Sequence, residues 1–229
     1  MESCNRPTLS ITAFCECTLR EDCDLAICTE IGRLQEALRL TQLGARAGLV
    51  SQLTGMEKTA ANRLYRRLHG KLSPSGLMPF TDAWYLKCAR RMLHASQVWH
   101  LHKRLAGDGR SPGRTLIDVY ECYTQREKKP LLDLTRTFLV PRLVTMNIWR
   151  EHLCRDCGTH YPAPDNITEN RCAGCRIHYR FRCRNCQAPV PQSRGRPRAR
   201  CDRCGTSLKQ SSHRKIKETT NEPSHGRLC

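Results

Sequence analysis

The chain has 229 residues, enough for one sizeable hydrophobic core with a small appendage or for two modest domains. Lys and Arg outnumber Asp and Glu by 39 to 21, which gives a net charge of +18 and predicts a polyanionic partner, with nucleic acid the default candidate. Hydrophobic residues make up 39% of the chain, and no stretch approaches the roughly 18 consecutive apolar residues that a membrane span needs. These features argue against a membrane protein.

The N-terminus lacks the basic segment and apolar core of a secretory signal peptide, which predicts a cytoplasmic protein. In a reducing compartment, paired Cys-x-x-Cys motifs among the 16 cysteines are more often metal ligands than disulfides. The alternative, a secreted disulfide framework, would require a signal sequence.

The first 28 residues are rich in cysteine and show no hydrophobic periodicity, so they are expected to be poorly ordered. A third metal site formed by Cys15, Cys17, Cys23 and Cys28 is the alternative, but their spacing matches no common zinc motif.

A helical pattern begins at Thr29, which is a suitable N-cap residue. The apolar residues Ile31, Leu34, Leu38 and Leu43 recur on one helical stripe, with Arg and Glu on the other face. The pattern predicts an amphipathic helix packed against the core through this stripe.

The segment "RAGLVSQLTGMEKTAANRLYRRL" has the spacing of a helix-turn-helix, with Gly55 in the turn and Gly70 ending the second helix. The second helix is expected to bury Ala60, Leu64, Tyr65 and Leu68. Its outer face would then present possible contacts to bases and phosphates: Lys58, Thr59, Asn62, Arg63 and Arg66. An ordinary helical hairpin is the alternative interpretation.

Three further helices are expected after a breaker-rich loop at residues 71–80. One long helix should run from Thr81 or Asp82 to Gly107, another should begin at Ser111 and Pro112, and the last should extend from Pro130 to Leu153.

Two features inside these helices carry their own predictions. Cys88 and Cys122 lie on helical stripes and are expected to be core thiols. Pro141 should kink or split the last helix, because proline removes one backbone hydrogen bond and clashes with the preceding turn.

Two cysteine quartets of identical spacing follow the helices. Each contains two Cys-x-x-Cys pairs separated by 14 residues, a pattern typical of tetrahedral zinc: Cys154, Cys157, Cys172 and Cys175, then Cys183, Cys186, Cys201 and Cys204. The repeat favours an internal duplication with one zinc ion per quartet, although cross-braced pairing stays open. Four thiolates leave no open coordination position, so both sites should be structural, and redox sensing is the weaker alternative.

The second quartet lies in a strongly basic region. Residues 150–217 contain 16 Lys or Arg against five Asp or Glu, which favours contact with a nucleic-acid backbone, and its densest part supplies further candidates: Arg194, Arg196, Arg198 and Arg200. The fold class expected is mainly α, with a helical domain at 29–152, zinc modules at 153–178 and 179–206, an extension at 1–28 and a disordered polar tail at 207–229.

Residues 30–175 resemble the flagellar transcriptional activator FlhC family. The resemblance rests on Leu43-Gly44-Ala45-Arg46, on Gly76, Pro79, Phe80 and Trp84, on His94-Ala95-Ser96, on Leu134-Thr135-Arg136 and on the first cysteine quartet, which stand in the family's order. It implies a helical DNA-binding subunit that has one zinc site at Cys154, Cys157, Cys172 and Cys175. It also implies a hetero-oligomer with FlhD that binds double-stranded promoter DNA and recruits RNA polymerase to flagellar operons.

Three features depart from the family pattern: the second quartet, the cysteine-rich N-terminus and Pro141. No nucleophile motif or open metal site indicates an enzyme. The competing interpretation is a zinc-dependent scaffold that binds protein or RNA without reading promoter DNA.

Overall fold

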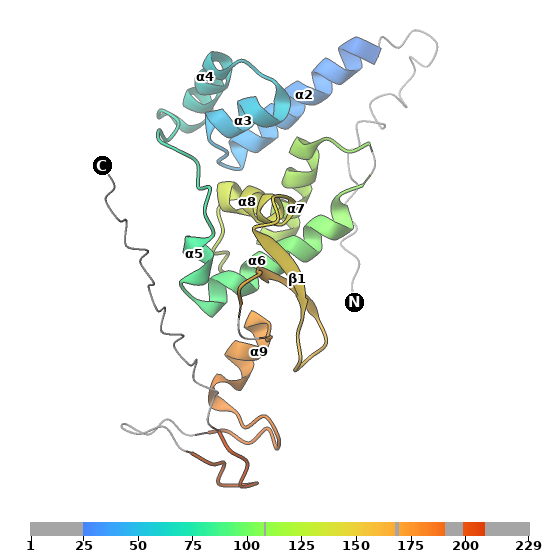
Figure 1. Ribbon diagram of the computed structural model, residues 1–229. Helices are drawn as coiled ribbons and strands as arrows, with labels where there is room; N and C mark the ends of the chain where they lie inside the picture. Colours follow the sequence, from blue (N-terminus) through green and yellow to red (C-terminus); the bar gives the residue numbers. More distant parts are fainter. Residues whose placement is uncertain (1–24, 108, 168–169, 191–198, 209–229) are drawn as a thin grey trace, which may run out of the picture. The chain divides into compact units, whose positions relative to one another are not determined.

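The computed structural model describes residues 25–107, 109–167, 170–190 and 199–208 (Figure 1). The chain divides into two compact units, residues 1–177 and 178–229. The expected fold class, mainly α, is confirmed. The first unit contains α2 (Leu25–Gln42), α3 (Ala47–Thr54), α4 (Lys58–His69), α5 (Ala83–Leu86), α6 (Ala89–Leu105), α7 (Pro112–Arg126), α8 (Leu134–Thr145), β1 (Trp149–Leu153), β2 (His160–Pro164) and most of α9 (Ala173–His178).

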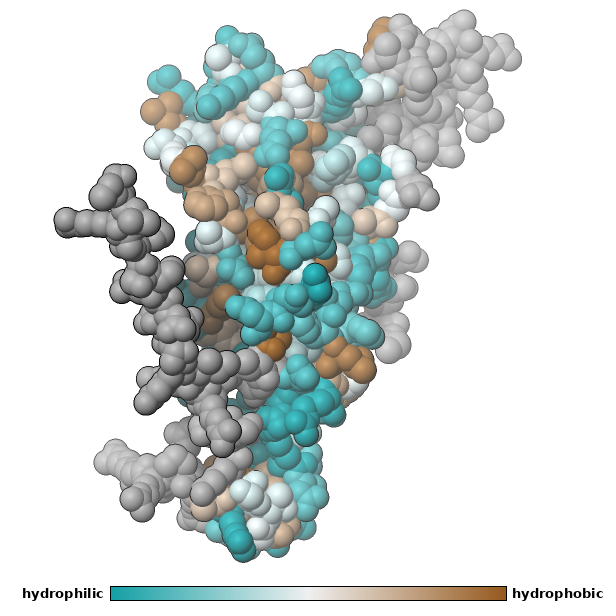
Figure 2. Space-filling model, viewed as in Figure 1, coloured by the Kyte–Doolittle hydropathy of each residue, from teal (hydrophilic) through white to brown (hydrophobic). Residues whose placement is uncertain are grey.

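The core of the first unit forms where α2, α3, α4 and α7 meet. Its centre is built from small and aliphatic side chains: Ala37, Leu40, Ala45, Leu49, Val50, Ala61 and Ile117. Hydrophilic residues dominate the described surface on the face drawn in Figure 2, in keeping with the low hydrophobic content of the chain. No helix within the described ranges is long and apolar enough to cross a membrane.

Helix α2 turns a different face to the core from the one predicted. It begins at Leu25 rather than Thr29, and it buries Ala37 and Leu40 instead of the Ile31, Leu34 and Leu38 stripe. Leu34 and Leu38 are 50% and 40% exposed, whereas Leu43 packs against the core as expected. The sequence periodicity identified the stripe of large aliphatic residues but missed a second stripe of smaller side chains, which contains Ala37 and Leu40. This second stripe faces the core because small side chains allow α3 and α4 to approach α2 closely.

Helix α6 is shorter than the predicted long helix. Cys88 adopts an extended conformation with φ −157° and ψ 151°, so the segment divides into the single turn α5 and the helix α6. The prediction that Cys88 is a core thiol is wrong, because the residue is exposed, and Cys122 is only half-buried. Asp82 makes no side-chain capping bond, since its carboxylate accepts a hydrogen bond from Trp149 Nε1 at 2.9 Å.

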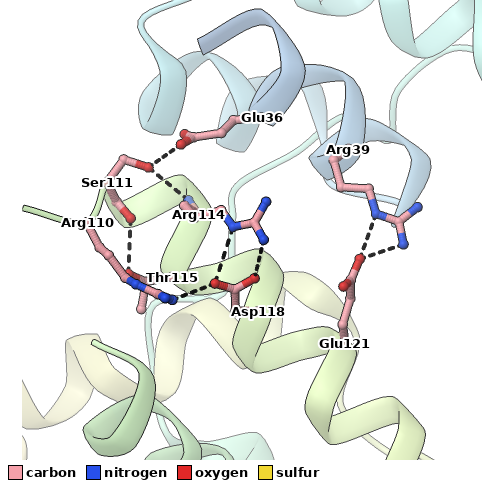
Figure 3. Close-up of polar contacts among 8 residues, drawn as sticks. All are labelled: Glu36, Arg39, Arg110, Ser111, Arg114, Thr115, Asp118 and Glu121. Atoms are coloured by element: carbon pink, nitrogen blue, oxygen red, sulfur yellow. Dashed lines mark hydrogen bonds and ion pairs between the residues drawn. The ribbon is translucent and has the colours of Figure 1, made fainter. Parts of the chain in front are cut away.

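Helix α7 begins as the sequence predicts, with Ser111 as N-cap and Pro112 in the first turn. The Ser111 Oγ accepts a hydrogen bond from Arg114 N at 2.9 Å and donates to the buried Glu36 carboxylate on α2 (Figure 3). Burial raises the pKa of Glu36, and the Ser111 hydroxyl and the Arg114 guanidinium oppose that rise. The start of α7 is therefore anchored to α2 by a buried polar contact.

The close approach of α2 and α7 at Gly113 provides a stability test. A Cβ at Gly113 would lie 2.6 Å from Glu36 Oε2, so Gly113→Ala should destabilise the protein by about 1–3 kcal/mol. Gly48→Ala on α3 is the matched control, because a Cβ there meets nothing within 4 Å and should stabilise by about 0.4–1 kcal/mol. Urea unfolding of both variants would measure the difference, and equal effects would contradict the packing described.

The last predicted helix is only partly helical. Helix α8 begins after the N-cap Asp133 and continues through Pro141 to Thr145, so the proline does not split it. Val140 and Leu143 flank Pro141 and are buried where α8 packs against α6 and α7. This packing stabilises the helix in spite of the proline. Residues 149–153, predicted as helix, instead form β1, which pairs antiparallel with β2.

Candidate metal centres and helix-turn-helix

The structure brings each cysteine quartet together as a separate group. The ligand sulfurs lie within 4.8 Å of one another in both groups, and the grouping is tandem rather than cross-braced. The Sγ–Sγ distance is 3.7 Å between Cys157 and Cys172, and 3.6 Å both between Cys183 and Cys204 and between Cys186 and Cys201. Four sulfurs around a tetrahedral zinc ion at about 2.3 Å each are roughly 3.8 Å apart, so the spacing fits a metal site and exceeds a disulfide bond.

The first centre combines a turn with the start of a helix. Cys154 and Cys157 lie in the turn between β1 and β2, where Gly158 has φ +68° and its N–H donates to Cys154 O at 2.8 Å. Cys172 and Cys175 instead lie at the start of α9, and the Cys172 N–H donates to Cys154 Sγ at 3.3 Å. Backbone N–H groups thus help to hold thiolates in place.

An ion pair joins the two halves of the first centre. Arg171 Nε lies 3.3 Å from Asp156 Oδ2, and both side chains are 15% exposed. Asp156 stands between the first two ligands and Arg171 precedes the third, so the pair links the turn to α9. The sequence analysis missed this pair, although opposite charges directly beside ligands of the two Cys-x-x-Cys pairs were a usable signal.

The second centre is built differently, from two similar turns. Gln187, with φ +59°, and Gly205, with φ +70°, each follow a Cys-x-x-Cys pair. Their N–H groups donate to Cys183 O at 3.0 Å and Cys201 O at 2.9 Å. The first centre contains only one such turn, so equal sequence spacing does not give equal structure, and the duplication hypothesis gains no support from the conformation.

Thr159 and Thr206 each act on one ligand of the two centres, the exposed Cys157 and the half-buried Cys204. The hydroxyl and N–H of Thr159 lower the pKa of Cys157 to about 6, and those of Thr206 lower the pKa of Cys204 to about 6. A lower thiol pKa increases the thiolate fraction that binds metal. Both threonines stand in a Cys-Gly-Thr sequence, a signal that the spacing analysis did not use.

The first group of residues predicted for DNA contact, Lys58 to Arg66, lies on α4. Helix α3 ends at Gly55, with φ +73°, and α4 begins three residues later and packs against α2 and α3. Ala61 and Tyr65 are buried, whereas Ala60 and Leu64 are half-buried and Leu68 is 40% exposed, so the predicted inner face was partly wrong. The predicted outer residues are all exposed: Lys58, Thr59, Asn62, Arg63 and Arg66.

Arg67 is a further exposed cation on α4 that the sequence analysis missed, although it follows Arg63 by one helical turn. Among the described residues, none of the α4 cations forms an ion pair or side-chain hydrogen bond. In the second unit, Arg200 is exposed beside Cys201, and Arg194, Arg196 and Arg198 lie outside the described residues. Residues 1–24 of the cysteine-rich N-terminus and the polar tail beyond residue 208 also lie outside them, whereas residues 25–28, predicted to be poorly ordered, form the first turn of α2.

These features define a mainly helical protein with two short helices joined by a glycine turn and four-cysteine centres able to bind metal ions. The family model described as "Flagellar transcriptional activator (FlhC)" matches residues 24–199. The chain therefore belongs to the FlhC family, as the sequence resemblance predicted. The match continues past Cys186 but ends before Cys201, so the second centre is only partly inside it.

Curated relatives support the family assignment. The chain is 27% identical over 167 residues to the flagellar transcriptional regulator FlhC of Enterobacter cloacae, covering 70% of this chain and 82% of the relative. It is 27% identical over 175 residues to the protein of the same name from Xenorhabdus nematophila, covering 72% and 83%. It is 28% identical over 151 residues to that of Serratia marcescens, covering 62% and 77%. All three are named as regulators of transcription.

Proposed function

We propose that the chain is a cytoplasmic, non-enzymatic activator subunit that binds promoter DNA with FlhD in a hetero-oligomer. It recruits RNA polymerase to flagellar operons, and each cysteine quartet holds one structural Zn2+ ion. The observation that carries the DNA-binding part of this proposal is the outer face of α4, which follows a glycine turn and presents exposed cations that have no partner among the described residues.

The zinc ions would act on structure rather than on chemistry. When bound, each supplies a closed four-thiolate crosslink, which leaves no coordination position for water or substrate. The residues of the chain would then position the basic surface, and Arg200, next to Cys201, would lie at a turn that the bound metal stabilises.

The arrangement on α4 suggests separate tasks for its side chains. Arg63 lies on the side opposite the buried Ala61 and Tyr65, and the exposed Asn62 lies on the flank of that outer face, where a recognition helix would face the major groove. An asparagine there can pair with adenine, whereas Lys58 and Arg66 would neutralise phosphates. We therefore expect sequence preference and salt dependence to respond to different substitutions.

The test is binding of the chain with FlhD to a flagellar promoter duplex and to a scrambled duplex, measured by fluorescence anisotropy over a range of salt concentrations. Asn62→Ala should weaken promoter binding by about 1–3 kcal/mol and reduce the preference over the scrambled duplex. Arg66→Ala should weaken both complexes and lower the slope of log affinity against log salt by about 0.9.

Lys128→Ala is the matched control, because Lys128 is an exposed cation away from α4. It should leave both affinities within about twofold of the wild type if the α4 cations act locally. Equal affinity of the wild type for promoter and scrambled DNA, with no response to Asn62→Ala, would favour the scaffold interpretation.

A further inference from the structure

Helix α2 carries two apolar faces, and the fold uses only one of them. The face containing Ala37 and Leu40 is fully buried against neighbouring helices. A second face, rotated around the helix from the first, carries larger aliphatic side chains, which we call the α2 seam: Ile27, Ile31, Leu34 and Leu38. Ile27, Leu34 and Leu38 are 58%, 50% and 40% exposed, and Ile31 is half-buried.

The spacing of the α2 seam restricts what can cover it. Its residues follow at intervals of four, three and four positions, which is the a/d pattern of a coiled coil. On an 18-residue helix this pattern forms a straight ridge about 16 Å long, suited to the groove of another helix rather than to a small ligand. A single exposed leucine needs no explanation, but a ridge with heptad spacing indicates a helical partner.

The polar residues beside the α2 seam leave it free to pack against an apolar helix face. Gln35 and Gln42 on one flank are uncharged and exposed. Nearby charges on α2 already have partners within the chain. Arg33 Nη1 lies 3.6 Å from Glu30 Oε2. Arg39 Nη2 lies 2.5 Å from Glu121 Oε1 on α7 (Figure 3). A docking helix therefore meets an apolar ridge without having to match a free charge.

A second copy of this chain is a poor occupant for two reasons. Two heptads contribute few side chains to the roughly 1,200–2,000 Å² that a stable interface buries, so the seam alone would not hold two copies together. Each copy also carries a net charge of +18, which opposes association of like chains. A different protein with net negative charge and a wider contact surface satisfies both conditions.

We propose that the α2 seam docks an amphipathic helix of a net-acidic partner subunit. This inference rests on the proposed hetero-oligomer and assigns its contact to one helix face. Because the other face of α2 packs against α3 and α4, docking on the seam fixes the orientation of the recognition helix relative to the partner. The seam thus connects subunit assembly to the placement of α4 on DNA.

The experiment uses the full chain and, as probe, the FlhD subunit from the same genome. Leu34→Glu places a charge at the centre of the seam and should weaken binding to FlhD by about 30-fold or more in calorimetric titrations. Leu34→Met should retain binding within about threefold, because it keeps the apolar ridge. Leu72→Glu is the matched control, since Leu72 is 75% exposed in the loop after α4 and lies outside the seam.

Two further measurements, made on the chain without FlhD, distinguish a partner subunit from the other molecules or segments that could cover the seam. Light scattering after size exclusion should show the same mass for wild type and Leu34→Glu, and their melting temperatures should agree within about 2 °C. Loss of a homodimer in Leu34→Glu with unchanged FlhD affinity would assign the seam to a second copy and overturn the proposal. A lower melting temperature with unchanged FlhD affinity would assign it to another segment of the same chain.

Failure of the seam assignment can be distinguished from failure of the proposed hetero-oligomer with FlhD. If wild type and Leu34→Glu bind FlhD equally well, the seam assignment is wrong and the hetero-oligomer stands. If the wild type does not bind FlhD, the proposed partnership is wrong, and the seam assignment that rests on it is rejected as well.

Discussion

Cys183→Ser is expected to remove one of two zinc ions and to unfold the segment around the second centre without destabilising the helical unit. Among described residues of the second unit, only Cys183 and Cys201 are buried, at 0% and 5% exposure. A segment that buries little except its ligands has almost no hydrophobic contribution to folding. A metal ion bound there would supply the missing stability, since zinc contributes on the order of 10–16 kcal/mol in small zinc domains at pH 7.

Cys154→Ser is the informative comparison, because the first centre is supported by a hydrophobic core. Tyr161 and Ala163 on β2 are 3% and 0% exposed, and β2 packs against α6. Loss of the first zinc ion should therefore lower the melting temperature of the helical unit by several degrees, since about 1 kcal/mol corresponds to 2–4 °C in a domain of this size.

Zinc content by atomic absorption and limited proteolysis would check both variants. Cys183→Ser should contain one zinc ion, be cleaved in the 178–208 segment and keep the melting temperature of the helical unit within about 2 °C. Two zinc ions in Cys183→Ser, or a protease-resistant second segment after chelation, would contradict the metal-dependent folding argued here.

The sequence predicts the ligand sets well because each set consists of local motifs. A Cys-x-x-Cys turn brings two thiolates together whatever the rest of the chain does, so the spacing identified four ligand pairs. The repeat of the motif, rather than the spacing itself, favoured tandem grouping of these pairs over cross-bracing. The conformational difference between the centres depends on residues after each pair. Gly158 and Gly205 favour a left-handed turn, whereas Arg176 after Cys175 continues the helix α9.

Fold predictions failed where tertiary packing chose between local alternatives. Helix α2 has two apolar stripes, and periodicity cannot decide whether the Leu34 stripe or the Leu40 stripe faces the core. The segment "WREHL" has no alternating pattern, yet it becomes β1 because it pairs with β2 and buries Trp149. Cys88 breaks a helix without Gly or Pro, so no local signal marked the division between α5 and α6.

Trp149→Ala is expected to cause the largest loss of stability by a single core substitution, about 3–5 kcal/mol. Trp149 is 0% exposed, and its ring packs edge-on against Tyr85 with ring centroids 5.3 Å apart. Its Nε1 donates to Asp82 Oδ2 at 2.9 Å, and the Tyr85 hydroxyl donates to Arg136 O at 2.7 Å. The side chain thereby connects β1 to α5 and, through Tyr85, to α8.

The same substitution should weaken zinc binding at the first centre, because β1 leads directly into Cys154 and loses its anchor when the indole is removed. Trp149→Phe is the matched control: it keeps most of the packing, loses only the hydrogen bond to Asp82, and should cost about 1–2 kcal/mol of stability.

Urea unfolding would give the stability change, and competition with a chromophoric chelator would give the zinc affinity of each centre. If the first centre of Trp149→Ala retained zinc against the chelator as well as the wild type does, the β1–β2 hairpin would hold its ligands without the helical core. Loss of affinity at the first centre alone would show that the helical core, and not only the ligand spacing, determines how tightly that metal is held.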